Sequence, residues 1–162
     1  MTFVYEEDKS LILNASRIYV SYSGGADSTY ALVKIREYLD SVKLTSKLIA
    51  LHFNHENKQS SAFESHCRDF CNERNITFES QNIDVEVSGE GFEAAARHKR
   101  MNVLKSLPEN SLVIQGHHSD DQIETVLFRI IRGTGLKGIS GIPRVAKVGE
   151  NKILRPFLKE TK

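Results

Sequence analysis

Residues 17–28, RIYVSYSGGADS, carry the clearest structural signal in this chain. The run 17–22 is rich in β-branched and aromatic residues and predicts a strand, while an amphipathic helical pattern covers residues 28–39. Two adjacent glycines between them let the backbone approach a polyanion closely, and the amides that follow lie at the positive end of the helix dipole. A strand that passes through such a turn into a helix predicts a phosphate-binding loop.

The rest of the chain repeats this alternation of strand and helix. Further strands are predicted over 47–53, 77–87 and 111–115, and further helices over 61–75, 92–107 and 120–132. Such alternation favours right-handed crossovers onto a parallel sheet. We therefore expect one doubly wound α/β domain over residues 1–162, with helices on both faces of a mostly parallel, five-stranded sheet. The glycine-rich stretch after Arg132 predicts a loop.

The composition is typical of a globular protein, with 40% hydrophobic and 27% charged residues among 162. A net charge of +1 means that any contact with nucleic acid must come from a local patch. No apolar stretch approaches the roughly 18 residues needed to cross a bilayer, and the first ten residues lack a signal-peptide pattern. We expect a cytoplasmic protein with no membrane partner. Cys67 and Cys71 predict partly buried thiols on a peripheral helix.

The glycine loop differs from the two common phosphate motifs, because it has neither GxxxxGK[ST] nor GxGxxG. Its SGGxDS pattern resembles the PP-loop of the N-type ATP pyrophosphatases, which cleave ATP between the α and β phosphates. The resemblance implies that Asp27 holds Mg²⁺ and that ATP phosphates lie against Ser23, Gly24, Gly25, Ala26, Asp27 and Ser28. In the alternative interpretation, the glycines form a tight turn and Asp27 with Ser28 caps the helix.

A second group of polar residues follows the predicted strand 111–115. Gly116 and His117 come directly after it, and Asp121 and Glu124 lie three residues apart at the start of the next helix. Carboxylates are favoured at a helix N-terminus, and this spacing predicts an acidic clamp suited to an ammonium group or a metal.

Five motifs, SGGADS, LHFNH, EAAARHKR, GHHSDDQIETVLFRIIRGTG and RPFL, resemble those of tRNA(Ile)-lysidine synthetases in order and approximate spacing, over nearly the whole chain. The resemblance implies the N-terminal catalytic domain of an enzyme that adenylates the wobble cytidine of isoleucine tRNA with a CAU anticodon, and then attaches L-lysine. It further implies tRNA-binding domains after Lys162, and a homodimer is an additional expectation.

The same resemblance implies roles for individual residues. Arg97 would face the phosphate or the cytidine, and Asp121 with Glu124 would hold the amine of lysine. Residues near the nucleotide would be His52, Phe53, Asn54, Gly116 and His117, with Arg129 and Arg132 toward the RNA.

Two other functions stay open from the sequence. A PP-loop enzyme that thiolates tRNA would also adenylate a base carbonyl, but sulfur transfer needs reactive thiols, and the CxxxC spacing of Cys67 and Cys71 differs from CxxC. A non-catalytic nucleotide-binding module would need the phosphate loop without the acidic clamp.

Overall fold

The computed structural model describes residues 5–54, 58–83, 91–133 and 140–161. The helices in these ranges are α1 (Glu6–Asn14), α2 (Ala26–Ser41), the short 3-10 helix η1 (Thr45–Lys47), α3 (Lys58–Glu73), α4 (Phe92–Ser106) and α5 (Ser119–Ile131). The strands are β1 (Ile18–Ser21), β2 (Leu48–Asn54), β3 (Thr77–Asn82), β4 (Leu112–Ile114), β5 (Val145–Val148) and β6 (Asn151–Leu154). No helix among the described residues is long and apolar enough to cross a membrane.

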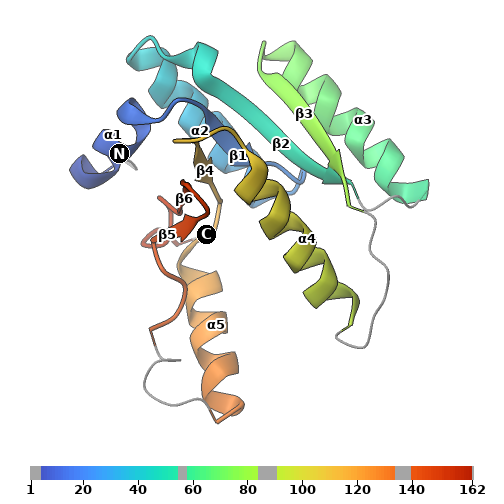
Figure 1. Cartoon of the computed structure of the whole chain (residues 1–162), viewed down its shortest axis with the longest axis vertical. Coiled ribbons are helices and arrows are strands. Elements are labelled where there is room, and N and C mark those ends of the chain that lie inside the picture. Colours follow the sequence, from blue (N-terminus) through green and yellow to red (C-terminus); the bar gives the residue numbers. More distant parts are fainter. Residues whose placement is uncertain (1–4, 55–57, 84–90, 134–139, 162) are drawn as a thin grey trace.

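The strands form one sheet in the order β3-β2-β1-β4-β6-β5 (Figure 1). All neighbouring pairs are parallel except β5 and β6, which are antiparallel. The mostly parallel, doubly wound sheet is confirmed, but the expected count of five strands was wrong, because the sheet has six. After β1 the chain adds β2 and β3 on one side of it and then crosses over to β4 on the other side, so the carboxyl ends of β1 and β4 form a topological switch point, where such sheets bind ligands.

The missed strands belong to a hairpin, β5–β6, whose turn contains Gly149 at φ 59°. Only two residues separate the strands, and a two-residue hairpin turn requires positive φ in its first position, which favours glycine. The sequence VAKVGENKIL carries this signal as two short strand-forming runs around Gly149 and Glu150. Each run is only four residues long and contains a lysine, so the pattern is weak beside the longer strands.

The other predicted elements agree with the structure apart from their ends. The helix predicted over 28–39 spans Ala26–Ser41, and the one predicted over 61–75 spans Lys58–Glu73. The strand predicted over 77–87 ends at Asn82, and its last residues lie outside the described ranges. Helix α1 was not predicted, although its acidic first turn is a typical helix start.

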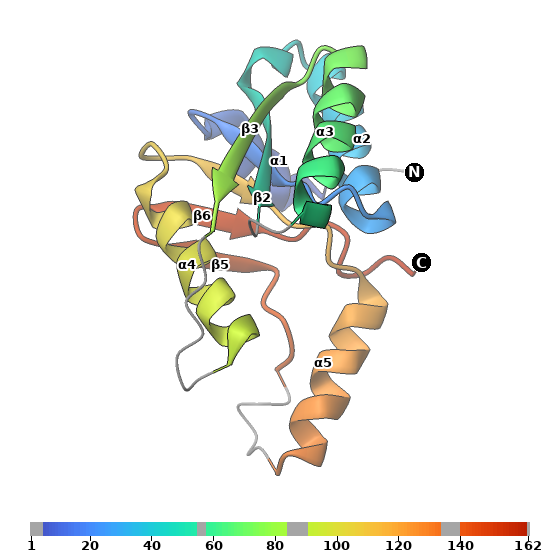
Figure 2. The ribbon, with the colours of Figure 1, turned by 90° about the vertical axis from the view of Figure 1, so that its right-hand side faces the viewer.

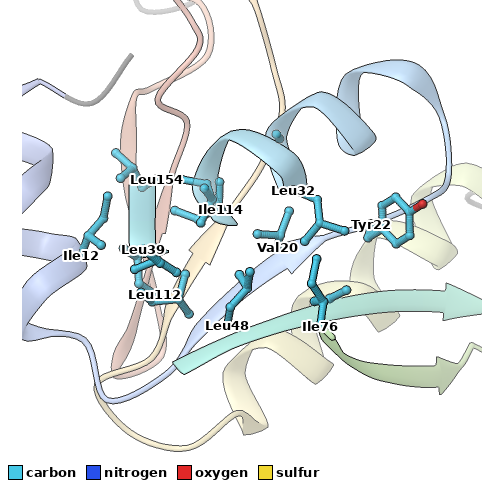
Figure 3. Close-up of a cluster of buried hydrophobic side chains, with 14 of the residues drawn as sticks. Ile12, Val20, Tyr22, Leu32, Leu39, Leu48, Ile76, Leu112, Ile114 and Leu154 are labelled. Carbon is cyan, nitrogen blue, oxygen red and sulfur yellow. The ribbon is translucent and has the colours of Figure 1, made fainter. Parts of the chain in front are cut away.

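Helices cover both faces of the sheet, because alternate strand residues point to opposite sides. On one face, Ile12 of α1, Leu32 of α2 and Cys71 of α3 are fully buried against the strands, and Figure 3 shows part of this cluster. On the other face, Leu104 of α4 packs with Val113 of β4. Burying each large aliphatic side chain contributes about 1.5–3 kcal/mol. The two clusters therefore fix the sheet between α1–α3 and α4.

Helix α5 extends away from the sheet beyond the carboxyl ends of the strands (Figures 1 and 2). None of its residues is buried. Its position is fixed by the side chain of Gln122, which accepts a hydrogen bond from Ile142 N at 2.6 Å, and by Arg129 Nη1, which donates to Gly141 O at 2.9 Å. One flank of α5 therefore faces the segment that leads into β5.

A buried ion pair joins α1 to the last strands. Asp8 is only 1% exposed and pairs with Arg144. Arg144 Nη1 also donates to Pro156 O at 3.3 Å, and the Arg155 amide donates to Arg144 O at 2.9 Å. Because these contacts hold the residues that flank β5 and β6, they fix Arg155 at the carboxyl edge of the sheet.

Candidate active site

The phosphate loop leaves β1 and opens directly into α2. Gly24 has φ +80°, and a Cβ added there would lie 2.7 Å from Cys67 Sγ. Gly25 is the N-cap of α2 and makes no side-chain capping bond. A helix N-terminus with no capping side chain presents its amides and its dipole to an anion. The alternative in which Asp27 and Ser28 cap this helix does not fit, because Gly25 occupies the cap position.

The loop is braced from within and from β2. Ser23 N donates to Ser28 Oγ at 3.2 Å, and Ser28 Oγ donates to Gly25 O at 2.9 Å. His52 is 5% exposed, and its Nδ1 lies 2.9 Å from Tyr22 O. A carbonyl can only accept, so His52 Nδ1 carries the proton and donates. These bonds hold the loop in shape without a ligand.

A cavity of about 920 Å³ opens at the carboxyl edge of the sheet, between the phosphate loop, α4 and α5. It brings together ten of the predicted site residues: Ser23, Gly25, Asp27, Ser28, His52, Phe53, Arg97, Gly116, His117 and Asp121. Four others do not line it: Gly24, Ala26, Asn54 and Glu124.

Two of these four have a clear structural reason. Asn54 is buried, and its Nδ2 donates to Glu64 Oε2 of α3 at 2.5 Å, so it joins β2 to that helix. On α5, the residues that line the cavity are spaced by four, at Asp121, Thr125 and Arg129. Glu124 is exposed and lies on the neighbouring flank, so the structure does not bring it together with Asp121 as a clamp.

Gly116 allows close packing at the switch point. A Cβ added at this position would lie 2.7 Å from Asp27 O and 3.1 Å from Ala31 Cβ. Only glycine lets the end of β4 lie this close to the first turn of α2, whatever ligand the cavity binds.

Asp27 and Asp121, here called the carboxylate pair, meet at His118. His118 Nε2 lies 3.6 Å from the Oδ2 atom of each aspartate. Its Nδ1 accepts from Asp120 N at 3.3 Å as the N-cap of α5, so the N–H of the ring is on Nε2 and faces the pair. The predicted site did not include His118, because histidine is not among the residues that typically cap a helix and Ser119 is the more usual candidate.

Four cations that line the cavity, here called the basic wall, are Arg97 and Arg100 from α4, Lys147 from β5 and Arg155 after β6, and Arg129 of α5 lines the same cavity. Burial, and then the charge of Arg97, lower the pKa of Arg155. Of the basic wall, the predicted site contained only Arg97. Arg155 belongs to the RPFL motif, whereas Lys147 lies on the hairpin that the sequence prediction missed.

Several polar atoms at the floor of the cavity have no hydrogen-bond partner within the described parts of the chain. They are Ser21 Oγ, Gln115 Oε1, His117 Nδ1 and Arg155 Nε. Such buried atoms are costly unless a ligand or water satisfies them. Burial, together with the charge of Arg155, lowers the pKa of His117, so this ring is neutral near physiological pH.

Both cysteines are free and fully buried. Burial raises the pKa of Cys67, and it raises the pKa of Cys71 to about 11. Partly buried thiols were expected on a peripheral helix, but Cys67 lies directly beneath Gly24 of the phosphate loop. Cys67 therefore supports the loop, and both thiols are protonated, without the exposure that a reactive cysteine needs. Within the described ranges, no group of three or more His, Cys, Asp or Glu side chains could hold a metal ion.

Comparison with known proteins finds relatives that match nearly the whole of this chain. The tRNA(Ile)-lysidine synthase of Francisella tularensis subsp. tularensis (strain WY96-3418) is 38% identical over 164 residues, which cover 95% of this chain and 40% of that protein. The protein of the same name from Coxiella burnetii (strain RSA 493 / Nine Mile phase I) is 35% identical over 150 residues, which cover 91% of this chain and 33% of that protein. This chain thus spans about 40% or less of the length of these relatives.

A solved structure with the same fold is the U34-tRNA thiolase NcsA from Methanococcus maripaludis with its [4Fe-4S] cluster. The TM-score is 0.65 at 20% identity, and the match covers 99% of this chain and 60% of the thiolase. At that identity the likeness concerns the fold alone. The PP-loop domain family matches residues 3–162, which include the phosphate loop, the carboxylate pair and the basic wall, and the chain therefore belongs to the PP-loop domain family.

Proposed function

We propose that this domain uses ATP to attach L-lysine to the wobble cytidine of isoleucine tRNA with a CAU anticodon, through an adenylated base. One observation carries the proposal: an uncapped phosphate loop and a carboxylate pair share a single cavity at the switch point of the sheet. The relatives named tRNA(Ile)-lysidine synthase support the choice of substrate.

In the proposed first step, the base oxygen of cytidine attacks the α phosphorus of ATP. The bond from that phosphorus to the bridging oxygen breaks, and pyrophosphate leaves with the electron pair. The phosphate loop, from Ser23 to Ser28, would hold the pyrophosphate part with backbone amides and hydroxyls. Arg97 would offset the charge that grows on the α phosphate, through a charge-assisted hydrogen bond.

In the proposed second step, the lysine side-chain amine attacks the activated base carbon, the bond from carbon to oxygen breaks, and AMP leaves. Asp121 would bind the amine as an ammonium ion and orient it before the proton is lost. Glu124 is kept as a second amine ligand in the proposal, and its side chain would have to turn toward the cavity. The reaction needs no covalent bond to the protein.

The proposal includes Mg²⁺ beside the phosphate loop. Carboxylate and phosphate oxygens are its preferred ligands, and Asp27 lines the same cavity as the loop. We assign Mg²⁺ to Asp27, where the ion would neutralise charge on the phosphates.

The two alternatives have less support. Thiolation would need an accessible thiolate, and burial keeps both Cys67 and Cys71 protonated. A nucleotide-sensing module would need no paired carboxylates beside the phosphate loop. Retention of lysine transfer in a Cys67→Ala, Cys71→Ala variant would exclude thiol chemistry, and loss of transfer with unchanged folding would favour it.

The proposal includes a cytoplasmic homodimer held by α5. Five exposed hydrophobic side chains lie on this helix: Ile123, Leu127, Phe128, Ile130 and Ile131. Its first turn is acidic and its last turn is basic, so an antiparallel pair of α5 helices would match opposite charges. Sedimentation equilibrium should show a dimer that Leu127→Glu dissociates, and a monomeric wild-type protein would contradict this assembly.

The activity is tested by incubating the protein with ATP, Mg²⁺, radiolabelled lysine and isoleucine tRNA bearing CAU. Label should become covalently attached to the RNA, and Asp27→Ala should abolish attachment without unfolding the protein. Asp40→Ala is the matched control, because Asp40 is an exposed residue of the same helix that pairs with Arg36 away from the cavity. Absence of label with the wild-type protein, or equal loss in both variants, would refute the proposed function.

A further inference from the structure

Polar side chains from three adjacent strands form a row at the carboxyl edge of the sheet. Ser21 ends β1, and Gln115 and Arg155 directly follow β4 and β6. Two positions earlier, the same strands carry buried side chains that pack beneath α4: Tyr19, Val113 and Ile153. Residues two apart in a strand share one face of the sheet. Ser21, Gln115 and Arg155, here called the floor row, therefore take the place of the next apolar layer, and all three line the cavity.

The floor row lacks hydrogen bonds that buried polar groups need. Ser21 Oγ, Gln115 Oε1 and Arg155 Nε are buried, and none has a partner among the described residues. Gln115 Oε1 can only accept, Arg155 Nε can only donate, and the hydroxyl of Ser21 can do either. A ligand that satisfies the row must therefore bring both donors and acceptors. An ionised phosphate group brings acceptors alone and would leave Gln115 Oε1 without a partner.

Arg155 is a partly buried cation without a counter-ion. Its Nη1 donates to Pro143 O at 2.7 Å, and no carboxylate within the described ranges pairs with it. The guanidinium of Arg144, by contrast, pairs with Asp8. Burial, and then the charge of Arg97, lower the pKa of Arg155, as expected for a cation that has no opposite charge beside it. This end of the floor row therefore favours an anionic group.

A negative charge lies near the same part of the cavity. After burial, the charge of Arg155 lowers the pKa of His117 and that of Asp121 raises it, so this ring is close to both charges. L-lysine carries one ammonium group at the end of its four-carbon side chain, and a carboxylate and a second ammonium group at the other end. Its two ends therefore match Asp121 and the floor row.

We propose that the floor row binds the α-carboxylate and the α-ammonium group of L-lysine, while the side-chain amine lies at Asp121. Arg155 Nε donates to the carboxylate, and Gln115 Oε1 and Ser21 Oγ accept from the α-ammonium group. This inference rests on the proposed lysine substrate. Each unsatisfied atom of the row gains a charge-assisted hydrogen bond of the kind that it can make. Asp121 alone would accept any primary amine, so the row determines the specificity for an amino acid.

The test compares L-lysine with two analogues that keep the reacting amine but lack one group at the other end. Cadaverine lacks the α-carboxylate, and ε-aminocaproate lacks the α-ammonium group. Each compound is supplied in radiolabelled form with ATP, Mg²⁺ and isoleucine tRNA bearing CAU, and KM is measured from the label attached to the RNA. The wild-type protein should have a higher KM for either analogue than for L-lysine.

Two variants remove the proposed contacts one at a time. Arg155→Gln should raise KM for L-lysine about tenfold to hundredfold, as expected for loss of a hydrogen bond between charged groups, and should leave KM for cadaverine nearly unchanged. Arg155→Lys keeps a cation and should restore part of the preference for L-lysine over cadaverine. Gln115→Leu should raise KM for L-lysine but not for ε-aminocaproate.

Arg100→Gln is the matched control for Arg155→Gln. Arg100 is exposed, lines the same cavity and carries the same charge. This variant should leave the ratio of KM for cadaverine to KM for L-lysine at the wild-type value. Circular dichroism and KM for ATP verify that each variant folds and binds nucleotide. If Arg155→Gln does not fold, Gln115→Leu with ε-aminocaproate decides the question.

A wild-type protein that uses cadaverine as well as L-lysine would overturn this inference and leave the proposed function in place, because lysine would still be attached. An equal rise in KM for L-lysine and cadaverine in Arg155→Gln would also overturn it, as would a rise in KM for ATP alone. Absence of label from L-lysine with the wild-type protein would instead overturn the proposed function itself.

Discussion

Replacement of Gly24 by alanine tests the geometry of the phosphate loop without any ligand. The added methyl group would sit 2.7 Å from Cys67 Sγ and 3.0 Å from Phe63 Cε1, and φ at this position is +80°. A left-handed conformation costs an L-residue about 1–2 kcal/mol. Overpacking of a filled site costs a further 1–3 kcal/mol or so. The free energy of unfolding should therefore fall by about 2–5 kcal/mol, a large share of the roughly 5–15 kcal/mol that stabilises a domain.

Gly25→Ala is the matched control for this change. Gly25 has φ −72°, which alanine adopts freely, and an added Cβ would meet only Ser23 Oγ at 3.5 Å. Its unfolding free energy should change by less than about 1 kcal/mol, because alanine restricts the unfolded chain but is a poorer N-cap residue than glycine. The comparison isolates backbone strain and the clash from the general effect of replacing glycine.

Urea unfolding followed by circular dichroism measures both variants, with melting temperature as a second readout. A Gly24→Ala, Cys67→Ala double variant separates the two costs, since removal of the sulfur relieves the clash but leaves the strained φ. The double-mutant cycle should give a favourable coupling of about 1–2 kcal/mol. A Gly24→Ala protein as stable as Gly25→Ala, or a coupling near zero, would show that Gly24 does not pack on Cys67 in this conformation.

Three further predictions concern the residues around the loop. His118→Ala removes the N-cap acceptor of α5 and should lower the free energy of unfolding in urea by about 0.5–2 kcal/mol, whereas His118→Asn keeps a cap and should lower it less. Lysine transfer should fall in both variants, because neither side chain reaches the carboxylate pair. Unchanged transfer in the asparagine variant would contradict this positioning role. Burial lowers the pKa of His117 from its ordinary value of 6.5, so the contribution of this ring to the free energy of unfolding is fully present above that pH and declines as the pH falls, because the unfolded state then binds more protons. The free energy of unfolding of His117→Gln should therefore differ less between about pH 8 and about pH 5 than that of the wild-type protein. The same difference in both proteins would argue against a neutral buried ring. Cys67 and Cys71 should resist a thiol reagent in the folded protein and react after unfolding, because both are fully buried and the pKa of Cys71 is about 11. Fast reaction without denaturant would mean that α3 does not shield the two thiols from solvent.

The local features of this protein can be predicted from its sequence. Residues 17–28 predict the strand, the phosphate loop and the helix because each depends on neighbours in the chain: apolar periodicity, two glycines and the start of a helix. Ten of the predicted site residues line one cavity for a related reason, since loops that follow parallel strands meet at one edge of the sheet. The five motifs also predicted the family.

Which distant side chains meet depends on how the helices and strands pack. The basic wall depends on Lys147 and Arg155, which reach the cavity through the hairpin β5–β6 beside β4, and no local pattern fixes that strand order. Glu124 was predicted to lie beside Asp121 from its spacing in the sequence, but it does not line the cavity. The rotation of α5 about its axis is set by contacts with Gly141 and Ile142, which no local pattern predicts. Cys67 beneath Gly24 is a packing contact between α3 and a loop that lies more than 40 residues earlier in the chain. Sequence spacing determines which residues share one face of a helix or strand. Burial and hydrogen bonds between elements determine which neighbour that face contacts.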